Sequence, residues 1–372
     1  MGDECETRIM TRITDQPQVT PLSFKAQVDE HLGRLLANAI ARAQAVDPSY
    51  AELLGVVRDQ VLGRGKRLRP YIMLTAYEGC GGREVEAALR AAVSQELFHN
   101  YLLIHDDVID RDTVRHGRPN VLGVYHRRFM EQGLSSDEAW HQASSFALLA
   151  GNAAMAIGFE AILDTQFPAD RQLAAVRHVQ RMLFEEMGGQ LTDVAAALPA
   201  GGVPTLDTLL RVCRYKTACY SFEVPLLVGA ELAGAPAPAK RKLAAFGQAL
   251  GVAFQLTDDL LGVFGREEVL GKPVLSDLQE GKRTVLIHFA LASATPAQSR
   301  ELGRLWGRRD AGASELESVR ELLWATSAPE QTMDLAESYL KTSLKALAGA
   351  GLSQDARSRL TELANFCVQR HF

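Results

Sequence analysis

Two clusters of aspartates are the residues of this 372-residue chain whose types and spacing could do chemistry. In the first cluster, Asp106, Asp107 and Asp110 follow an apolar stretch, and His99 lies two turns earlier. Asp106 and Asp110 are four residues apart, so on a helix both carboxylates point from one face and repel each other unless a cation lies between them. Mg2+ suits such a site because it prefers oxygen ligands and also binds substrate phosphates. The alternative interpretation is a solvated acidic end of a helix.

The second cluster is Asp258 and Asp259, again at the end of an apolar stretch, with Gln255 one turn earlier. Adjacent aspartates are common by chance, so this pair alone is a weak signal. Two such clusters, each at the end of an apolar helix, are a stronger one. In a helical bundle, facing helices would place both clusters across one cavity.

Basic residues gather in four places, where they could complement a diphosphate bound through metal ions. Any one basic run is more often a solvated face of the protein. A glycine-flanked basic loop is more suggestive, because glycine lets backbone N–H groups approach phosphate oxygens. The four groups are Arg64, Lys66, Arg67 and Arg69; Arg115 and His116; Lys216 with Thr217; and Lys272, Lys282 and Arg283.

The elements that must position these residues are predicted to be helices. From Phe24 onward good helix formers dominate and apolar residues recur three and four apart, which is typical of amphipathic helices. We therefore expect an all-α fold, a large single-domain helical bundle over residues 23–372 with a central active-site cavity. Residues 1–22 lack this pattern and predict a flexible N-terminal arm. Residues 142–159 carry no charge, but their polar side chains favour a fully buried bundle helix over a membrane span.

The composition excludes several classes of function. Apolar residues make up 47 % of the chain, charged residues 23 %, and the net charge is −5, which makes nucleic acid a poor candidate partner. The first twenty residues lack the apolar stretch of a signal peptide. The five cysteines show no CxxC spacing, so we expect reduced thiols in a cytoplasmic protein and neither a zinc site nor disulfides.

The motifs together resemble those of the trans-polyprenyl diphosphate synthase family, which includes geranylgeranyl and farnesyl diphosphate synthases. The resemblance runs from about Phe24 to Phe372 and keeps the family's order. The matching segments are residues 65–70 (GKRLRP), 106–110 (DDVID), 189–193 (GQLTD), 216–217 (KT), 254–259 (FQLTDD) and 281–284 (GKRT).

The resemblance implies a role for each candidate residue. Magnesium, three ions per active site, would be held by Asp106, Asp107, Asp110, Asp258 and Asp259. The diphosphate of isopentenyl diphosphate would be bound by Lys66, Arg69 and His99, with His116 beside them. The allylic diphosphate would be bound by Arg115, Lys216 and Lys282, with Thr217 and Gln255 lining the site, and Lys272 would be a further substrate-binding residue.

The reaction that the resemblance implies needs no side-chain nucleophile. Diphosphate leaves the allylic substrate, the double bond of isopentenyl diphosphate attacks the allylic carbocation that remains, and a proton is lost to the released diphosphate. The family also implies a homodimer. Two alternatives stay open: a terpene cyclase, whose NDxxSxxxE motif is not found here, and a non-catalytic subunit of a heteromeric synthase, which the intact acids disfavour.

Two positions depart from the family pattern. Gly262 stands where the second aspartate motif usually ends in Asp, and His116 replaces the second of two arginines that usually follow the first motif. Histidine is mostly neutral at pH 7, so the isopentenyl diphosphate pocket would lose a fixed charge.

Product length is predicted from the residues before the first motif. The resemblance links two features with a twenty-carbon product, geranylgeranyl diphosphate: an aromatic residue five positions before Asp106, here Tyr101, and a first aspartate motif without a two-residue insertion, here residues 106–110. A second aromatic residue at the next position, here Leu102, would favour the fifteen-carbon farnesyl diphosphate. The bulk of Phe98 is a complication, because it could also shorten the cavity.

Overall fold

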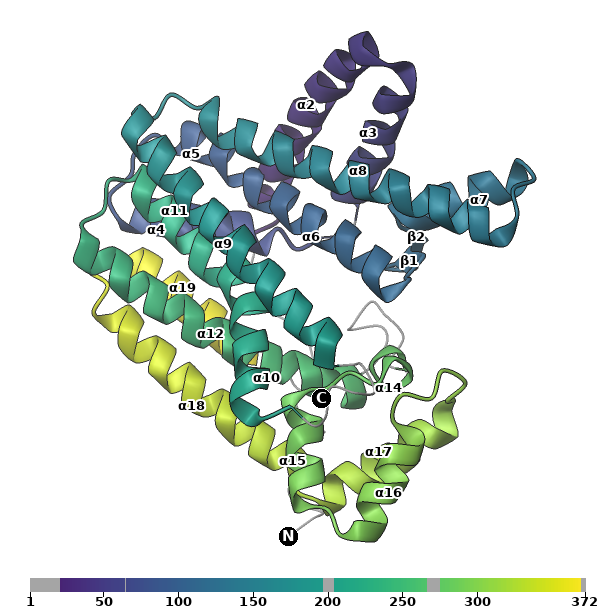
Figure 1. Cartoon of the computed structure of the whole chain (residues 1–372). Coiled ribbons are helices and arrows are strands. Elements are labelled where there is room, and N and C mark those ends of the chain that lie inside the picture. Colours follow the sequence, from purple (N-terminus) through teal and green to yellow (C-terminus); the bar gives the residue numbers. More distant parts are fainter. Residues whose placement is uncertain (1–20, 64, 197–203, 266–274, 369–372) are drawn as a thin grey trace. The chain divides into compact units, whose positions relative to one another are not determined.

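In the computed structural model, residues 21–63, 65–196, 204–265 and 275–368 are described. Helices dominate these residues, and the strands among them are a single two-stranded hairpin (Figure 1). The prediction of an all-α fold is confirmed. By their internal contacts the residues group into two compact units, Thr20–His178 with Pro225–Ala235, and Val179–Val224 with Pro236–Phe372, and the single domain over residues 23–372 stays a prediction.

The first unit contains the first aspartate cluster and the glycine-flanked basic loop. Its central pair is α6 packed on α8, while α3 packs on α2 and α7 on α8. Its elements are α2 (Leu22–Val46), α3 (Pro48–Val61), α4 (Leu68–Gly79), α5 (Val85–Ala92), α6 (Ser94–Asp110), β1 (Val114–Arg115), β2 (Arg118–Pro119), α7 (Val121–Glu131), α8 (Ser136–Leu163), the start of α9 (Ala169–Ala196) and most of α11 (Val224–Leu232).

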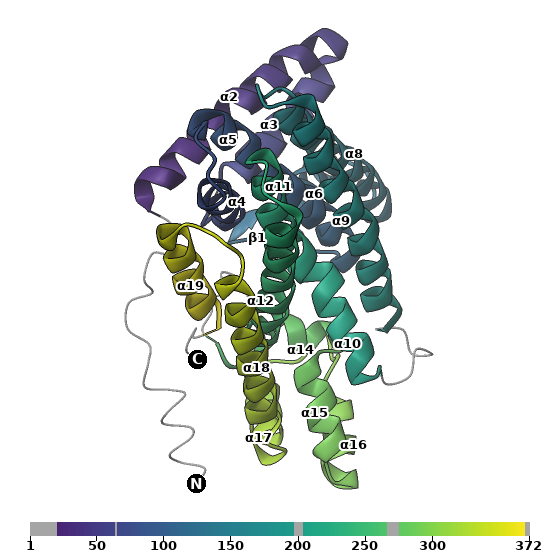
Figure 2. The same ribbon diagram turned by 90° about the vertical axis from the view of Figure 1, so that its left-hand side faces the viewer.

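The second unit contains the second aspartate cluster. Helix α12 is its centre, with α18 and α19 packed along it (Figure 2). The π-helix η2 also packs against α12. Its elements are the rest of α9, α10 (Leu206–Val212), η2 (Cys213–Glu223), α12 (Ala237–Phe264), α14 (Ser276–Glu280), α15 (Val285–Ser293), α16 (Pro296–Leu305), α17 (Ala313–Ala325), α18 (Ala328–Ala348) and α19 (Gln354–Val368).

Helix boundaries follow the local capping chemistry. Asp47 accepts a hydrogen bond from the backbone N–H of Ser49 at the start of α3, and Ser135 caps α8 in the same way. Helix α4 begins at Leu68, inside the predicted loop at residues 63–70, and Pro70 is tolerated there because the first turn needs no donor. Helix α2 begins at Leu22, and residues 1–20 lie outside the described residues, so the flexible arm stays a prediction.

The uncharged run at residues 142–159 lies in α8. Of the described helices, α8 is the one long and apolar enough to cross a membrane by length and composition. The prediction of a fully buried helix is wrong, because only half of its most apolar window is buried and Leu148 and Leu149 are exposed.

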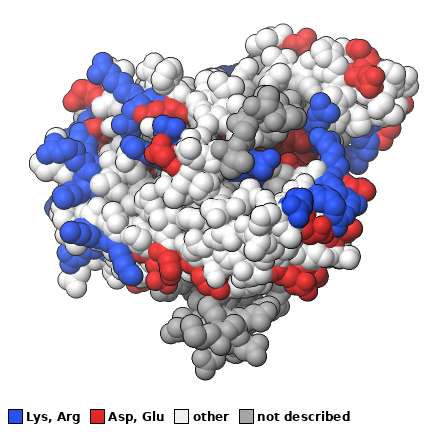
Figure 3. Space-filling view, turned by 60° about the horizontal axis from the view of Figure 1, so that its bottom comes forward, with Lys and Arg blue, Asp and Glu red and all other residues white. Residues whose placement is uncertain are grey.

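Charge on the described surface is mixed. Figure 3 shows a face on which basic and acidic groups lie next to one another in several places, with uncharged surface between those places.

Candidate functional site

The first aspartate cluster occupies the last turn of α6, which ends at Asp110. Asp106 and Asp110 are partly exposed, whereas Asp107 between them is 1 % exposed. The carbonyl end of a helix carries partial negative charge, so carboxylates there are unfavourable without a cation. The local structure therefore favours cation binding at Asp106 and Asp110, as the spacing predicts.

Asp107 forms a buried ion pair with Arg115. Nε and Nη2 of Arg115 donate hydrogen bonds to Oδ1 of Asp107 at 3.0 and 2.6 Å. Burial raises the pKa of Asp107 to about 6, although the Arg115 guanidinium acts in the opposite direction. Oδ2 of Asp107 is buried and accepts no hydrogen bond from the described residues. Arg115, predicted to bind the allylic diphosphate, thus already has a carboxylate partner in this structure.

A β-hairpin that the sequence analysis missed carries Arg115 and His116. Arg115 pairs with Arg118 across the two strands, and His116 and Gly117 form the turn between them. Both turn residues have positive φ, 52° and 73°, which is typical of the tight turns that close two-residue hairpins. The glycine after His116 is the one sequence signal for this turn. The hairpin leaves His116 exposed while its neighbour Arg115 reaches the buried Asp107.

The glycine-flanked loop separates its basic residues into different environments. Lys66 is exposed, Arg69 is partly buried, and Arg67 is 2 % exposed. Arg64 lies outside the described residues. The predicted phosphate-binding residues Lys66 and Arg69 therefore flank an arginine that points into the protein.

His99 lies among cations. Burial lowers its pKa well below the usual value, and the positive charges of Arg69, Arg115, Arg67 and His116 lower it further. The structure thus places His99 near Arg69 and His116, two of the residues predicted to bind isopentenyl diphosphate with it. His99 is neutral at pH 7 and would act as a hydrogen-bond donor and not as a fixed charge.

The second aspartate cluster is tied to η2 through a chain of hydrogen bonds. Thr217 Oγ1 donates to Gln255 Oε1 at 2.6 Å, and Gln255 Nε2 donates to Asp259 Oδ1 at 2.7 Å. Asp259 is buried, whereas Asp258 is partly exposed. The candidate residues Thr217, Gln255 and Asp259 therefore form one network, and Asp258 is the more accessible carboxylate.

Lys216 pairs with Asp193, a residue absent from the predicted site. The two side chains are 2.6 Å apart, between Nζ and Oδ2. A side chain at Gly189 would lie 2.8 Å from the backbone nitrogen of Lys216, so glycine is what allows α9 to approach η2 so closely. Asp193 is the last residue of the GQxxD segment at residues 189–193, and that motif was the sequence signal that Asp193 belongs to the site. Lys216 lies in the π-helix η2, and π-helical segments occur often at functional sites.

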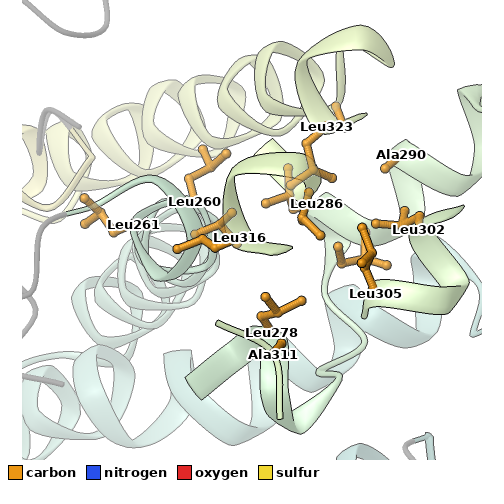
Figure 4. Close-up of a cluster of buried hydrophobic side chains, with 14 residues drawn as sticks. Leu260, Leu261, Leu278, Leu286, Ala290, Leu302, Leu305, Ala311, Leu316 and Leu323 are labelled. Carbon is orange, nitrogen blue, oxygen red and sulfur yellow. The ribbon is translucent and has the colours of Figure 1, made fainter. Parts of the chain in front are cut away.

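Lys282 lies beside two acids just after α14. Its Nζ is 2.9 Å from Glu280 and 3.6 Å from Asp277. A cluster of buried apolar residues holds α14 against α12. It includes Leu260 and Leu261, which directly follow the aspartates, and Leu278 of α14 (Figure 4). Lys272 lies outside the described residues.

The residues predicted to shape the product cavity are buried on α6. Phe98 is 2 % exposed and packs edge-to-face on Phe159 of α8, with ring centroids 5.1 Å apart. Tyr101 packs against the ring of His105 at 4.6 Å, and Leu102 is also buried.

The described acids suit a metal that takes few protein ligands. Three or more His, Cys, Asp or Glu side chains do not converge into a ready-made metal site anywhere in the described part of the chain. Mg2+ fits this donor set, because it usually binds one or two carboxylates and completes its shell with water and phosphate oxygens. The buried Oδ2 of Asp107, which accepts no hydrogen bond from the described residues, fits a nearby cation as well.

Comparison with known proteins identifies the family. The model of the polyprenyl synthetase family matches residues 51–323. The chain belongs to the polyprenyl synthetase family. All the candidate residues named above, from Lys66 to Lys282, lie within the matched region of this family member.

Relatives with different products resemble this polyprenyl synthetase. The (2E,6E)-farnesyl diphosphate synthase of Mycobacterium tuberculosis is 33 % identical over 309 residues, 82 % of this chain and 80 % of that protein. The geranylgeranyl diphosphate synthase of Saccharolobus solfataricus is 30 % identical over 311 residues, 82 % of this chain and 86 % of that protein. A crystal structure of geranylgeranyl pyrophosphate synthase from Corynebacterium glutamicum, complexed with isoprenyl diphosphate and magnesium, has a TM-score of 0.87 and 28 % identity, and covers 96 % of this chain and 100 % of that one.

Proposed function

We propose that this protein is a magnesium-dependent prenyltransferase that condenses isopentenyl diphosphate with an allylic diphosphate to give a short-chain polyprenyl diphosphate. The observation that carries the proposal is the first aspartate motif at the carbonyl end of α6, the helix that two turns earlier carries His99 close to the positive charges of Arg69 and Arg115. Membership of the polyprenyl synthetase family and relatives named for farnesyl and geranylgeranyl products support it.

Magnesium, when bound, would supply positive charge that stabilises the departing diphosphate. Asp106, Asp110 and Asp258 are the accessible carboxylates that would hold it, in a set of three ions. Asp107 and Asp259 are buried and hydrogen-bonded, so they would orient neighbouring groups and contribute less direct contact.

The basic residues would bind and hold the two substrates. Lys66, Arg69 and His99 would bind isopentenyl diphosphate, with His99 donating a hydrogen bond from a neutral ring. Lys216 and Lys282 would bind the allylic diphosphate, and their ion pairs with Asp193 and Glu280 keep both ammonium groups in place. Arg115 would bind the allylic diphosphate only if it exchanged or shared its hydrogen bonds to Asp107.

The proposed product is geranylgeranyl diphosphate, with twenty carbons. The buried ring of Tyr101 and the uninserted motif at residues 106–110 support this length. Farnesyl diphosphate is the second candidate, because the buried Phe98 lies further down the same helix and a 33 % identical relative is named a farnesyl diphosphate synthase.

The test is product analysis by mass spectrometry. Purified protein with magnesium, isopentenyl diphosphate and a ten- or fifteen-carbon allylic diphosphate should yield longer polyprenyl diphosphates. Cyclised hydrocarbons formed without isopentenyl diphosphate would instead support a terpene cyclase, and no turnover by the pure chain would support a non-catalytic subunit.

We also propose a homodimer. Four apolar side chains at helical spacing on the part of α9 that belongs to the second unit are exposed: Phe184 (80 %), Met187, Leu191 (70 %) and Val194. Such a patch marks an interaction surface. Sedimentation should give a dimer, and Phe184→Lys should shift it to monomer, whereas Val46→Lys, at an exposed valine that ends α2, should not.

A further inference from the structure

Arg67 makes an unusually complete set of contacts for an arginine in a phosphate-binding loop. Its Nε donates to Oδ1 of Asp29 at 2.6 Å, and its Nη1 donates to Oε2 of Glu96 at 2.8 Å. Its Nη2 donates to the backbone oxygen of Val61 at 2.8 Å. The side chain is 2 % exposed, so each nitrogen of the guanidinium has a protein partner and none faces solvent.

These contacts tie three helices to the loop. Asp29 belongs to α2, Val61 ends α3, and Glu96 belongs to the first turn of α6. Glu96 is itself 4 % exposed, so the Arg67–Glu96 pair is a buried ion pair. All three partners lie in the first compact unit, together with Arg67.

The backbone at Arg67 is also constrained. Its φ of 52° is left-handed, and it immediately precedes α4, which begins at Leu68. A left-handed conformation is costly for a residue other than glycine and persists only when its surroundings hold it. The three hydrogen bonds of the guanidinium stabilise this left-handed conformation, and they fix the direction in which the chain leaves the loop.

The neighbours of Arg67 are the residues expected to bind substrate. Lys66 directly precedes it, Arg69 follows by two positions, and Glu96 lies three residues before His99 on α6. One guanidinium therefore fixes both the basic loop and the helix that carries His99.

We propose that Arg67 is a positioning residue that sets the geometry of the isopentenyl diphosphate pocket by fixing Lys66 and Arg69 relative to His99. This inference rests on the proposed function. Arg67 does not touch the substrate, because its three nitrogens are already engaged and buried. Lysine could not replace it, since a single ammonium cannot reproduce a planar fork that reaches three partners.

The test compares Michaelis constants for the two substrates. Arg67→Lys keeps the charge but loses the fork, and it should raise the constant for isopentenyl diphosphate about tenfold while changing the constant for the allylic diphosphate less than about twofold. Arg58→Lys is the matched control, because Arg58 is a partly exposed arginine on the neighbouring α3 and pairs with the exposed Asp59. It should change neither constant.

Glu96 offers a second pair of variants in case Arg67→Lys folds poorly. Glu96→Gln keeps an oxygen that can accept from Nη1, so it should leave both constants within about threefold of wild type. Glu96→Ala removes the acceptor and should reproduce the effect of Arg67→Lys. Circular dichroism and thermal melting of each variant separate loss of folded protein from a change in substrate affinity.

Three results would overturn the proposal. The first is an unchanged constant for isopentenyl diphosphate in folded Arg67→Lys. The second is an equal rise in both constants, and the third is a fall in kcat alone. Lys66→Ala and Arg69→Ala separate this inference from the proposed function. If neither raises the constant for isopentenyl diphosphate, the substrate assignment fails, whereas if both do and Arg67→Lys does not, only the role of Arg67 fails.

Discussion

Gly262 packs so closely against the carboxylate of Asp277 that a Cβ at position 262 would collide with Oδ2 of Asp277. Asp277 is 6 % exposed and lies 3.6 Å from Nζ of Lys282. In related enzymes, as the resemblance implies, an aspartate usually stands at this position of the second motif. In this chain the carboxylate of Asp277, which comes from α14, takes up the space that such a side chain would need.

The first prediction is that placing the aspartate usual in the family at position 262 lowers both activity and stability. Gly262→Asp should lower turnover at least tenfold and lower the melting temperature, because two carboxylates would compete for one buried space. Gly262→Ala should show a smaller effect in the same direction, since it adds bulk without charge. Adding Asp277→Gly to Gly262→Asp should recover part of the lost stability. Higher turnover of Gly262→Asp than of wild type would show that the position tolerates a side chain.

A second prediction concerns the metal. Asp106→Ala and Asp258→Ala should each reduce turnover by several orders of magnitude and leave the circular dichroism spectrum unchanged, because both carboxylates are partly exposed and not part of the packed core. Magnesium with inorganic diphosphate should raise the melting temperature of wild type but not of these variants. Asp164→Ala, at an aspartate directly after α8, is the control. Near-normal turnover in Asp106→Ala or Asp258→Ala would contradict the magnesium assignment.

The third prediction follows from the lowered pKa of His99. An unfolded histidine binds a proton below about pH 6.5, whereas folded His99 stays neutral to a much lower pH. The unfolded state therefore takes up the extra proton, and the free energy of unfolding falls as the pH drops below about 6.5, by at most about 1.4 kcal/mol per pH unit for this group.

Denaturant titration at several pH values between 7.5 and 5.5 tests whether His99 contributes to this fall in the free energy of unfolding. The free energy of unfolding should fall less steeply with decreasing pH in His99→Gln than in wild type, and His141→Gln, at an exposed histidine of α8, should keep the wild-type slope. Identical slopes for wild type and His99→Gln would mean that the pKa of His99 is the same in the folded and the unfolded state, and would contradict the prediction.

Local sequence patterns predicted the helices and the acids but not their partners. The four-residue spacing of Asp106 and Asp110 is a property of one helix, and it correctly placed both on α6. The partners of Arg67 are 38 and 29 residues away, at Asp29 and Glu96, so no local spacing reveals that the arginine is buried.

Backbone geometry was harder still to predict. The π-helix at residues 213–223 depends on hydrogen bonds between residues five apart, and the side chains of this segment carry no pattern that distinguishes it from an α-helix. The hairpin at Arg115 and His116 has strands of two residues each, too short for any alternation of apolar and polar residues. The pairing of Arg115 with Asp107 depends on that hairpin, and so it too appeared only in the structure.

The fourth prediction concerns His116, at the exposed turn of the hairpin. If this position lies beside isopentenyl diphosphate, His116→Arg should lower the Michaelis constant for that substrate more than for the allylic one, because a charge-assisted hydrogen bond contributes about 1–3 kcal/mol. His116→Gln is the control for the loss of histidine without added charge. An unchanged or raised constant in His116→Arg would place the histidine away from the substrate.

The last prediction concerns product length and begins with the packing of α6 on α8. A side chain at Gly158 would meet the ring of Phe98 at 2.9 Å, so Phe98 is seated tightly against α8 and has little freedom to move. Tyr101, one turn nearer to the aspartates, packs on His105. The growing chain is expected to extend away from Asp106, so it would meet Tyr101 before it meets Phe98.

Removing the first obstacle should therefore lengthen the product. Tyr101→Ala should shift the mass spectrum of products beyond twenty carbons, because a ring that blocks an apolar tunnel no longer excludes the next five-carbon unit. Tyr101→Phe is the matched control, and it should change little because it keeps the ring. If Tyr101→Ala keeps the wild-type products while Phe98→Ala lengthens them, Phe98 forms the floor of the cavity. Its close packing against Gly158 and Phe159 would then explain why the ring cannot move aside for a longer chain.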